Sequence, residues 1–306
     1  MIEKDVWENC YERKWKHLIV NEAFCHPAKF SYNLIDRIYS HAMEKGWIKK
    51  GDTVLDPFGG VALGALGAIS NGINWIGVEL EKKFVRLGEE NIAKWITEVK
   101  RDLGIAKIIQ GDSRKLKFHL AKFIGTPDMV ISSPPYADSL SGSDKPQDHK
   151  RHQELATKAG HGRIGRGQLV YQNAYGRTLG NLSNMKDDGF WNASQEIVQQ
   201  CYDLIKPGGI AIWNVKDYLK NKEVFPFSDK WVEMNESVGF KVVCWHQATL
   251  LKVGQDLILG SKNADTFKDG DEVVQDITDR KGFFRRIQER KGFPKIDWEN
   301  VICMVK

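Results

Sequence analysis

The sequence predicts an α/β fold in which a mostly parallel sheet of seven strands carries helices on both faces. Short apolar or β-branched runs recur along the 306 residues, and stretches of helical length separate the first five of them. The runs also keep the length of buried strands rather than of helices. The expected strands are 53–55, 75–80, 108–110, 129–131, 210–215, 242–245 and 301–305.

The composition is that of an ordinary globular protein, with 42% hydrophobic residues, 28% charged residues and a formal net charge of +5. A chain of this length buries a sizeable core without disulfide or metal staples. No stretch approaches the ~20 apolar residues that a membrane-spanning helix needs, and the charged N-terminal segment is unlike a signal peptide. We therefore expect a cytoplasmic protein with no membrane partner.

The cysteines do not indicate a metal site or a disulfide framework. They lie far apart and in no paired spacing, so we expect them to be reduced and mostly buried, and we expect no bound metal. The five are Cys10, Cys25, Cys201, Cys244 and Cys303.

Residues 1–20 form a charged N-terminal segment that precedes the first predicted helix. Residues 33–45 then show apolar side chains at helical spacing and stop at Gly46, which predicts a helix before the first strand. We expect one domain over residues 1–306 with two insertions, at 137–190 and 261–300.

Both insertions are candidates for contact with a partner, because long segments without periodicity in a compact domain are usually functional or disordered. Residues 145–181 hold seven Lys or Arg against two Asp or Glu, and residues 280–291 form a second basic run. Phe283, Phe284 and Ile287 give that run an apolar face, so a packed helix that shows its arginines to solvent is an equally simple interpretation.

A glycine-rich turn follows the first predicted strand. The turn reads Asp56-Pro57-Phe58-Gly59-Gly60 and leads into a helical stretch, so its backbone can approach a ligand closely. Glu79 ends the next strand, where an acidic side chain can accept hydrogen bonds from ribose hydroxyls. Together they indicate an adenosine-containing ligand, although many α/β turns contain glycine for chain geometry alone.

The dinucleotide pattern G-x-G-x-x-G is absent, because the glycines fall at 59, 60 and 64. Asp112 and Ser113 end the third predicted strand at the same crevice. Asp112 is placed to meet an adenine amino group, and it is equally suited to cap a helix.

The fourth predicted strand ends in Ser133-Pro134-Pro135-Tyr136. Two successive prolines donate no N–H and fix φ, so the chain leaves the sheet as a stiff arm whose carbonyls can accept hydrogen bonds from an amino group. The Tyr136 ring is placed to stack on a planar base. The plainer alternative is a strand ended by proline, with Tyr136 packed in the core.

These motifs resemble the S-adenosylmethionine-dependent DNA amino-methyltransferases, which modify adenine N6 or cytosine N4. The segment 26–31 is similar to the family's motif before a helix beside the cofactor, and 204–209 is similar to a turn of class I methyltransferases. The resemblance implies a class I, Rossmann-like fold and a prokaryotic or viral host cell. The implied catalytic residues are Ser133, Pro134, Pro135 and Tyr136. The implied cofactor contacts are Lys29, Phe30, Ser31, Asp56, Pro57, Phe58, Gly59, Gly60, Glu79, Leu80, Asp112 and Ser113.

Two features depart from the family pattern. Ala62 stands where the cofactor loop commonly has glycine, which we expect to narrow the room for the methionine end of the cofactor. The tetrapeptide follows the cofactor loop, whereas many relatives with a Ser-Pro-Pro-Tyr tetrapeptide have it first, so a circularly permuted subgroup is implied.

The resemblance implies double-stranded DNA as the partner, a target base flipped out of the helix, and a place in restriction–modification. A tetrapeptide that begins with serine is associated with cytosine N4 more often than with adenine N6, so cytosine is favoured. Adenine, RNA, a protein glutamine amide and a catalytically idle nucleic-acid-binding protein stay as alternatives. The expected DNA contacts are Lys150, Arg151, Arg163, Arg166, Arg177, Arg285, Arg286 and Arg290.

Overall fold

A computed structural model describes residues 2–11, 15, 17–26, 30–98, 103–121, 127–136, 176, 178–253, 277–279 and 292–306. In this part of the chain, eight strands form one sheet in the order β1-β9-β12-β6-β5-β2-β3-β4. Neighbouring strands are parallel except around β12, which runs antiparallel to both β6 and β9. The predicted class I α/β fold is thereby confirmed.

The strands of the sheet are β1 (Glu3–Trp7), β2 (Thr53–Asp56), β3 (Asn74–Glu79), β4 (Ala106–Gln110), β5 (Met129–Ser132), β6 (Ile210–Val215), β9 (Lys241–Thr249) and β12 (Trp298–Val305). Two small antiparallel pairs are β7 (Tyr218–Lys220) with β8 (Glu223–Phe225), and β10 (Leu251–Val253) with β11 (Ile277–Asp279). The α-helices are α1 (Tyr32–Glu44), α2 (Leu63–Ser70), α3 (Lys82–Glu98), α4 (Leu116–Leu120), α7 (Asp187–Leu204) and α8 (Phe227–Val238). The 3-10 turns are η1 (Asn21–Cys25), η2 (Ser113–Lys115) and η3 (Leu182–Asn184).

The sheet has one strand more than the sequence predicts. All seven predicted runs are strands, and β1 adds an eighth by pairing in parallel with β9 at the edge of the sheet. β1 reads Glu-Lys-Asp-Val-Trp, and only Trp7 of it is buried. Charged side chains are common on edge strands because they prevent pairing with other chains. The same charges hide the strand from a search for apolar runs.

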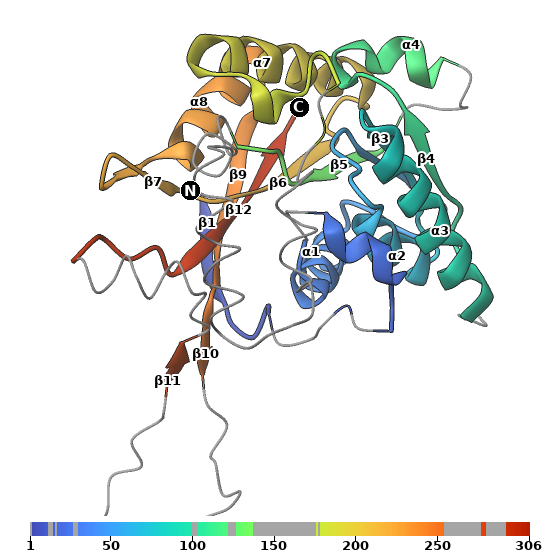
Figure 1. The fold of residues 1–306 in the computed structure, drawn as a ribbon, viewed down its shortest axis with the longest axis horizontal. Helices are drawn as coiled ribbons and strands as arrows, with labels where there is room; N and C mark the ends of the chain where they lie inside the picture. Colours follow the sequence, from blue (N-terminus) through green and yellow to red (C-terminus); the bar gives the residue numbers. More distant parts are fainter. Residues whose placement is uncertain are drawn as a thin grey trace, which may run out of the picture.

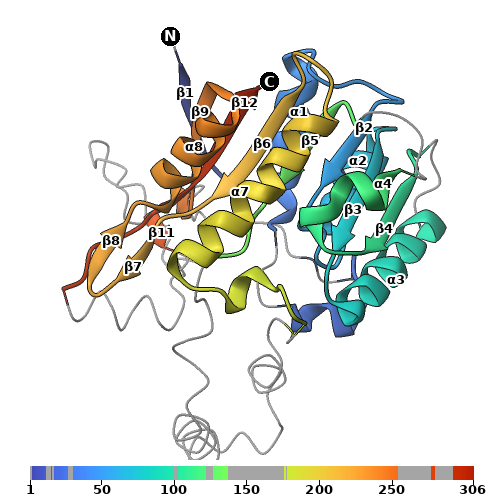
Figure 2. The ribbon, with the colours of Figure 1, turned by 90° about the horizontal axis from the view of Figure 1, so that it is seen from above.

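Helices cover both faces of the sheet (Figures 1 and 2). α1, α2 and α3 pack against one face, and α4, α7 and α8 pack against the other. Among the described helices, none is both long enough and apolar enough to cross a membrane.

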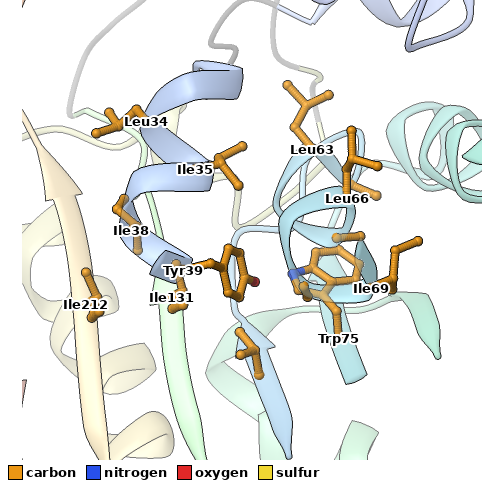
Figure 3. Packing of buried hydrophobic residues seen from close by; sticks show 14 of the residues in the cluster. Leu34, Ile35, Ile38, Tyr39, Leu63, Leu66, Ile69, Trp75, Ile131 and Ile212 are labelled. Carbon is orange, nitrogen blue, oxygen red and sulfur yellow. The ribbon is translucent and has the colours of Figure 1, made fainter. Parts of the chain in front are cut away.

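α1 and α2 lie unusually close together on the first face (Figure 3). Ile35 and Tyr39 of α1 face α2, and a Cβ atom added at Gly67 would lie 2.5 Å from each of them. A side chain at position 67 would therefore push α1 away from the sheet. The predicted helix 33–45 agrees with α1 to within a residue at either end.

The cysteines differ from the sequence expectation. Cys244 and Cys303 lie directly opposite each other on β9 and β12, with Cα atoms 5.0 Å apart, and the structure joins them in a disulfide. Cys10 and Cys201 are buried and free. The sequence analysis missed this pair because 59 residues separate the two positions.

Candidate functional site

A cavity of about 260 Å³ lies at the carboxyl ends of β2 to β6, and elements from distant parts of the sequence line it. In doubly wound sheets this end of the strands is where ligands bind. The predicted residues that line it are Phe30, Asp56, Pro57, Phe58, Gly59, Gly60, Glu79, Leu80, Asp112, Ser113, Ser133, Pro134, Pro135 and Tyr136.

Some predicted residues do not line this cavity. Ser31 does not, because its hydroxyl is turned toward the carbonyl oxygen of Cys10 and donates to it at 2.7 Å. Lys29 lies outside the described residues. So do all of the predicted DNA contacts, which are Lys150, Arg151, Arg163, Arg166, Arg177, Arg285, Arg286 and Arg290.

Asp56, at the end of β2, is a buried carboxylate that joins two parts of the cavity wall. It accepts a hydrogen bond from the backbone N–H of Phe58 at 3.0 Å and another from the hydroxyl of Ser132, the last residue of β5. Burial raises the pKa of Asp56 to about 6, although both hydrogen bonds oppose the rise. The glycine-rich turn is thereby tied to the strand that carries the tetrapeptide.

Glu79, at the end of β3, holds the glycine-rich turn in place. Its carboxylate accepts hydrogen bonds from the backbone N–H of Gly60 at 2.9 Å and of Glu81 at 2.8 Å. Gly60 has φ of +52°, and a Cβ atom there would lie 3.2 Å from the His26 ring, so glycine is required for two reasons. Burial raises the pKa of Glu79 to about 7.

The expectation that Ala62 narrows the cavity is wrong. Ala62 is fully buried and is not part of the cavity lining. It adopts a left-handed conformation, with φ of 61°, at the start of α2, and its methyl group lies beside Gly88 of α3. Left-handed geometry favours glycine, so the backbone explains why glycine is common at this place in the family.

Asp112 plays the structural role that the sequence left open. Its side chain accepts from the backbone N–H of Arg114, which caps the turn η2, and it also forms an ion pair with the Arg114 guanidinium. Burial alone would raise the pKa of Asp112, but the hydrogen bonds from Arg114 outweigh it and lower the pKa. Asp112 nevertheless lines the cavity while its carboxylate holds Arg114.

The tetrapeptide leaves β5 directly after the fully buried Ser132 and forms one wall of the cavity. The Tyr136 ring is half-buried and meets Phe227 of α8 edge-on, with ring centroids 4.9 Å apart. Tyr218 touches it from the side at 5.9 Å. Tyr136 is therefore both packed against the core and exposed to the cavity, which combines the two interpretations of the sequence.

The sequence analysis missed several polar residues of the cavity, among them Asn214 and Glu299. Asn214 of β6 donates to Glu299 of β12 at 2.8 Å, and its Oδ1 is buried with no hydrogen-bond partner in the described structure. Asn214 interrupts the otherwise apolar strand Ile-Ala-Ile-Trp-Asn-Val, which is a signal that the sequence offers. Glu299 offers no such signal, because its place in the cavity depends on the antiparallel return of β12.

The cavity is strongly acidic. Five carboxylates line it, and no lysine or arginine is among the lining residues that the structure describes. The five are Asp56, Glu79, Glu81, Asp112 and Glu299. Such a lining favours a cationic ligand and repels phosphate groups. It therefore argues against a dinucleotide, in agreement with the missing G-x-G-x-x-G pattern.

Comparison with known proteins finds a family that matches the N-terminal end of the chain and one relative that matches part of it. Residues 2–90 match the model of the DNA methylase family of N6 and N4 methyltransferases. The Type II methyltransferase M.BglI of Bacillus subtilis is 35% identical over 92 residues, which are 30% of this chain and 25% of that protein. The match thus spans about a quarter of the relative. The family match includes the glycine-rich turn and Glu79 but ends before Asp112 and the tetrapeptide.

Solved structures with a similar fold include a methyltransferase and a decarboxylase. The magnesium protoporphyrin IX methyltransferase of Synechocystis PCC 6803, solved with bound SAH, has a TM-score of 0.45 at 7% identity and covers 96% of this chain and 88% of its own. The precorrin 8w decarboxylase of Methanobacterium thermoautotrophicum has a TM-score of 0.45 at 12% identity. The superposition covers 97% of this chain and 98% of the decarboxylase. Similarity at this level says nothing about substrate.

Proposed function

We propose that this chain, whose residues 2–90 match the DNA methylase family of N6 and N4 methyltransferases, transfers a methyl group from S-adenosylmethionine to the exocyclic amino group of a base in DNA. One observation carries the proposal: the glycine-rich turn and the Ser133–Tyr136 arm line the same cavity. A donor held by the turn and a base held by the arm would therefore meet.

The charge of the cavity fits S-adenosylmethionine. This cofactor carries a sulfonium and an ammonium group, and five carboxylates face the space that it would fill. Glu79 would accept from the ribose hydroxyls and Asp112 from the adenine amino group, while the N-terminal turn of α2 would meet the carboxylate. When bound, the cofactor supplies an electrophilic methyl group on sulfur.

The arm would make the amino group reactive. The lone pair of an exocyclic amine is delocalised into the ring, so the nitrogen is a poor nucleophile until its N–H groups donate to acceptors that draw it toward tetrahedral geometry. The Ser133 hydroxyl or carbonyl and the Pro134 carbonyl would be those acceptors. The effect depends on fixed positions and preorganised dipoles.

The target base would be cytosine, methylated at N4, and it would leave the duplex to reach the cavity. Extrusion costs a few kcal/mol, and stacking on the Tyr136 ring would offset part of that cost. Support for cytosine over adenine comes from the serine that begins the tetrapeptide. The basic residues of 137–190 and 261–300 would contact the phosphate backbone, within one domain that spans residues 1–306.

Expression in a host that lacks DNA methylation tests this proposal. Its DNA would be sequenced with a method that distinguishes N4-methylcytosine from N6-methyladenine and reports the flanking bases. We expect N4-methylcytosine in one short sequence context, and clearly less of it with Tyr136→Ala. Modified adenine would correct the base, whereas DNA without any modification beside folded protein would contradict the proposal.

A further inference from the structure

Four side chains with metal-binding atoms meet at one buried point outside the cavity. They are His41 of α1, Cys244 and His246 of β9, and Cys303 of β12. Each offers one ligand atom, and the four atoms all lie within 4.8 Å of one another. None of the four lines the cavity described above, so the cluster is separate from the methyl-transfer site.

The register of the sheet creates this meeting. Cys303 lies directly opposite Cys244 on the antiparallel strands β12 and β9, with Cα atoms 5.0 Å apart. His246 follows Cys244 by two residues, and side chains two residues apart on a strand project to the same face of the sheet. α1 packs on that face and brings His41 within reach, so that its Nε2 lies 3.7 Å from the Cys244 sulfur.

The residue types are those of a tetrahedral zinc site with two sulfur and two nitrogen ligands, and one of the distances already agrees with it. The two sulfurs, which the structure bonds to each other, would separate to about 3.8 Å on reduction and metal binding. From Zn–S and Zn–N bond lengths of about 2.3 Å and 2.05 Å, the distance between a sulfur and a nitrogen ligand is about 3.6 Å. The observed 3.7 Å between Cys244 and His41 agrees with that value. Four protein ligands around one point make a closed site, which is typical of structural rather than catalytic zinc.

The hydrogen bonding of the cluster points the same way. Both ring nitrogens of His246 are buried and have no hydrogen-bond partner in the described structure, a costly arrangement for a polar ring. Trp7 stacks on the His246 ring at 4.6 Å and helps to exclude water.

A disulfide explains only half of this cluster. It joins Cys244 to Cys303, but it leaves His246 with two unpaired nitrogens and gives His41 only a weak sulfur contact. A metal ion would engage all four side chains.

We propose that His41, Cys244, His246 and Cys303 bind one Zn²⁺ ion as a structural site, with both cysteines as thiolates. The Cys244–Cys303 bond must first be cleaved by a thiol or phosphine reductant, which supplies two electrons and two protons. On binding, the two S–H protons then pass to water and two S–Zn bonds form, with no further electron transfer. The ion would join α1 to the strands β9 and β12, which are far from it in the sequence. Two sulfur and two imidazole ligands in a tetrahedron favour Zn²⁺ over Mg²⁺ or Ca²⁺, which prefer oxygen.

The test is the metal content of the full chain, purified without chelators and kept reduced with a phosphine. We expect one zinc ion per chain by elemental analysis. Cys303→Ser and His246→Ala should lose nearly all of it. Two matched controls, Cys201→Ser in α7 and His119→Ala in α4, remove the same residue types elsewhere and should keep it.

A second measurement uses the wild-type chain, so it does not depend on whether the variants fold. Replacing zinc by Co²⁺ should give the visible bands of a tetrahedral ion and a sulfur-to-cobalt charge-transfer band. Reduced protein without metal and without cobalt bands would overturn the proposal. So would a metal-free chain in which thiol labelling finds Cys244 and Cys303 joined to each other.

Discussion

The hydroxyl of Ser132 donates a hydrogen bond to the carboxylate of Asp56, and this single bond joins the strand that leads into the tetrapeptide to the glycine-rich turn. Both side chains are buried, and they lie 76 positions apart in the sequence. The bond therefore fixes the distance between the wall proposed to hold the base and the turn proposed to hold the methyl donor.

Ser132→Ala should weaken this link. It removes a donor from a buried carboxylate, which costs about 1–3 kcal/mol of unfolding free energy. The pKa of Asp56 should rise further, because the Ser132 hydrogen bond now lowers it. Urea denaturation would measure the loss of stability, and titration with S-adenosylmethionine over a range of pH would report the change in the pKa of Asp56.

Ser194→Ala is the matched control, because the Ser194 hydroxyl is equally buried in α7 but has no hydrogen-bond partner in the described structure. It should be close to neutral in both measurements. Equal losses of unfolding free energy for Ser132→Ala and Ser194→Ala would show that the hydrogen bond to Asp56 does not stabilise the fold.

Tyr136→Ala should separate methyl transfer from cofactor binding. Stacking of a base on an aromatic ring contributes about 1–3 kcal/mol, so we expect kcat/KM to fall roughly 5- to 150-fold. Tyr136→Phe should keep most of the activity, because it keeps the ring that packs on Phe227. Cofactor affinity, measured by calorimetry, should be nearly unchanged in both variants. Unaltered turnover of Tyr136→Ala would remove the proposed role of the ring.

Binding of S-adenosylmethionine should weaken as the pH falls below about 7. Burial raises the pKa of Glu79 to about 7, so below that pH the free protein holds a proton on Glu79. A cationic ligand favours the ionised carboxylate, and the proton must leave on binding. The dissociation constant should therefore rise by roughly tenfold per unit of pH well below this value, and level off above it.

Calorimetry in two buffers of different ionisation enthalpy would show that proton release directly. Glu79→Gln should bind more weakly and lose most of the pH dependence, with Asp56 contributing the remainder below about 6. An affinity that is constant between pH 5.5 and 8.5 would contradict a cationic ligand beside Glu79.

Glu81 should fasten the chain before α7 to the rim of the cavity. Its carboxylate accepts from the backbone N–H of Thr178 at 3.1 Å, from the Thr178 hydroxyl at 2.9 Å and from the Asn181 amide at 2.9 Å. Glu81→Ala removes three hydrogen bonds at once, so amide exchange around residues 178–184 should accelerate and cofactor affinity should fall. Glu89→Ala, at an exposed position of α3, the helix that follows Glu81, is the control and should leave both unchanged. Slow exchange that persists in Glu81→Ala would contradict this account.

The fold was predictable from sequence because short apolar runs of strand length alternate with segments of helical length. This alternation is typical of a parallel sheet whose strands are buried beneath helices. The glycine-rich turn, Glu79 and the tetrapeptide were predictable as cavity residues because parallel strands bring their carboxyl ends to one edge. β1 was not predictable, because an edge strand tolerates charged residues and so lacks the apolar run by which the other strands were recognised. Glu299 was not, because its position follows from the return of an antiparallel strand.

The proposed zinc site could not be predicted from sequence either, because it too depends on how distant segments pack. Its residues are His41, Cys244, His246 and Cys303. Metal sites are found in sequences by short spacings between ligands, and only Cys244 and His246 lie close together here. The other two ligands arrive through the packing of α1 and the register of β12.

The central claim is that one acidic cavity holds a methyl donor beside an amino group of DNA. The most direct measurement incubates the purified chain with DNA and S-adenosylmethionine that carries an isotope label in its methyl group, and then digests the DNA to nucleosides for mass spectrometry. The account predicts labelled N4-methylcytosine, formed several-fold or more slowly by Tyr136→Ala even though that variant still binds the cofactor. Label that enters only RNA or protein, or unlabelled DNA beside a chain that binds the cofactor, would contradict it.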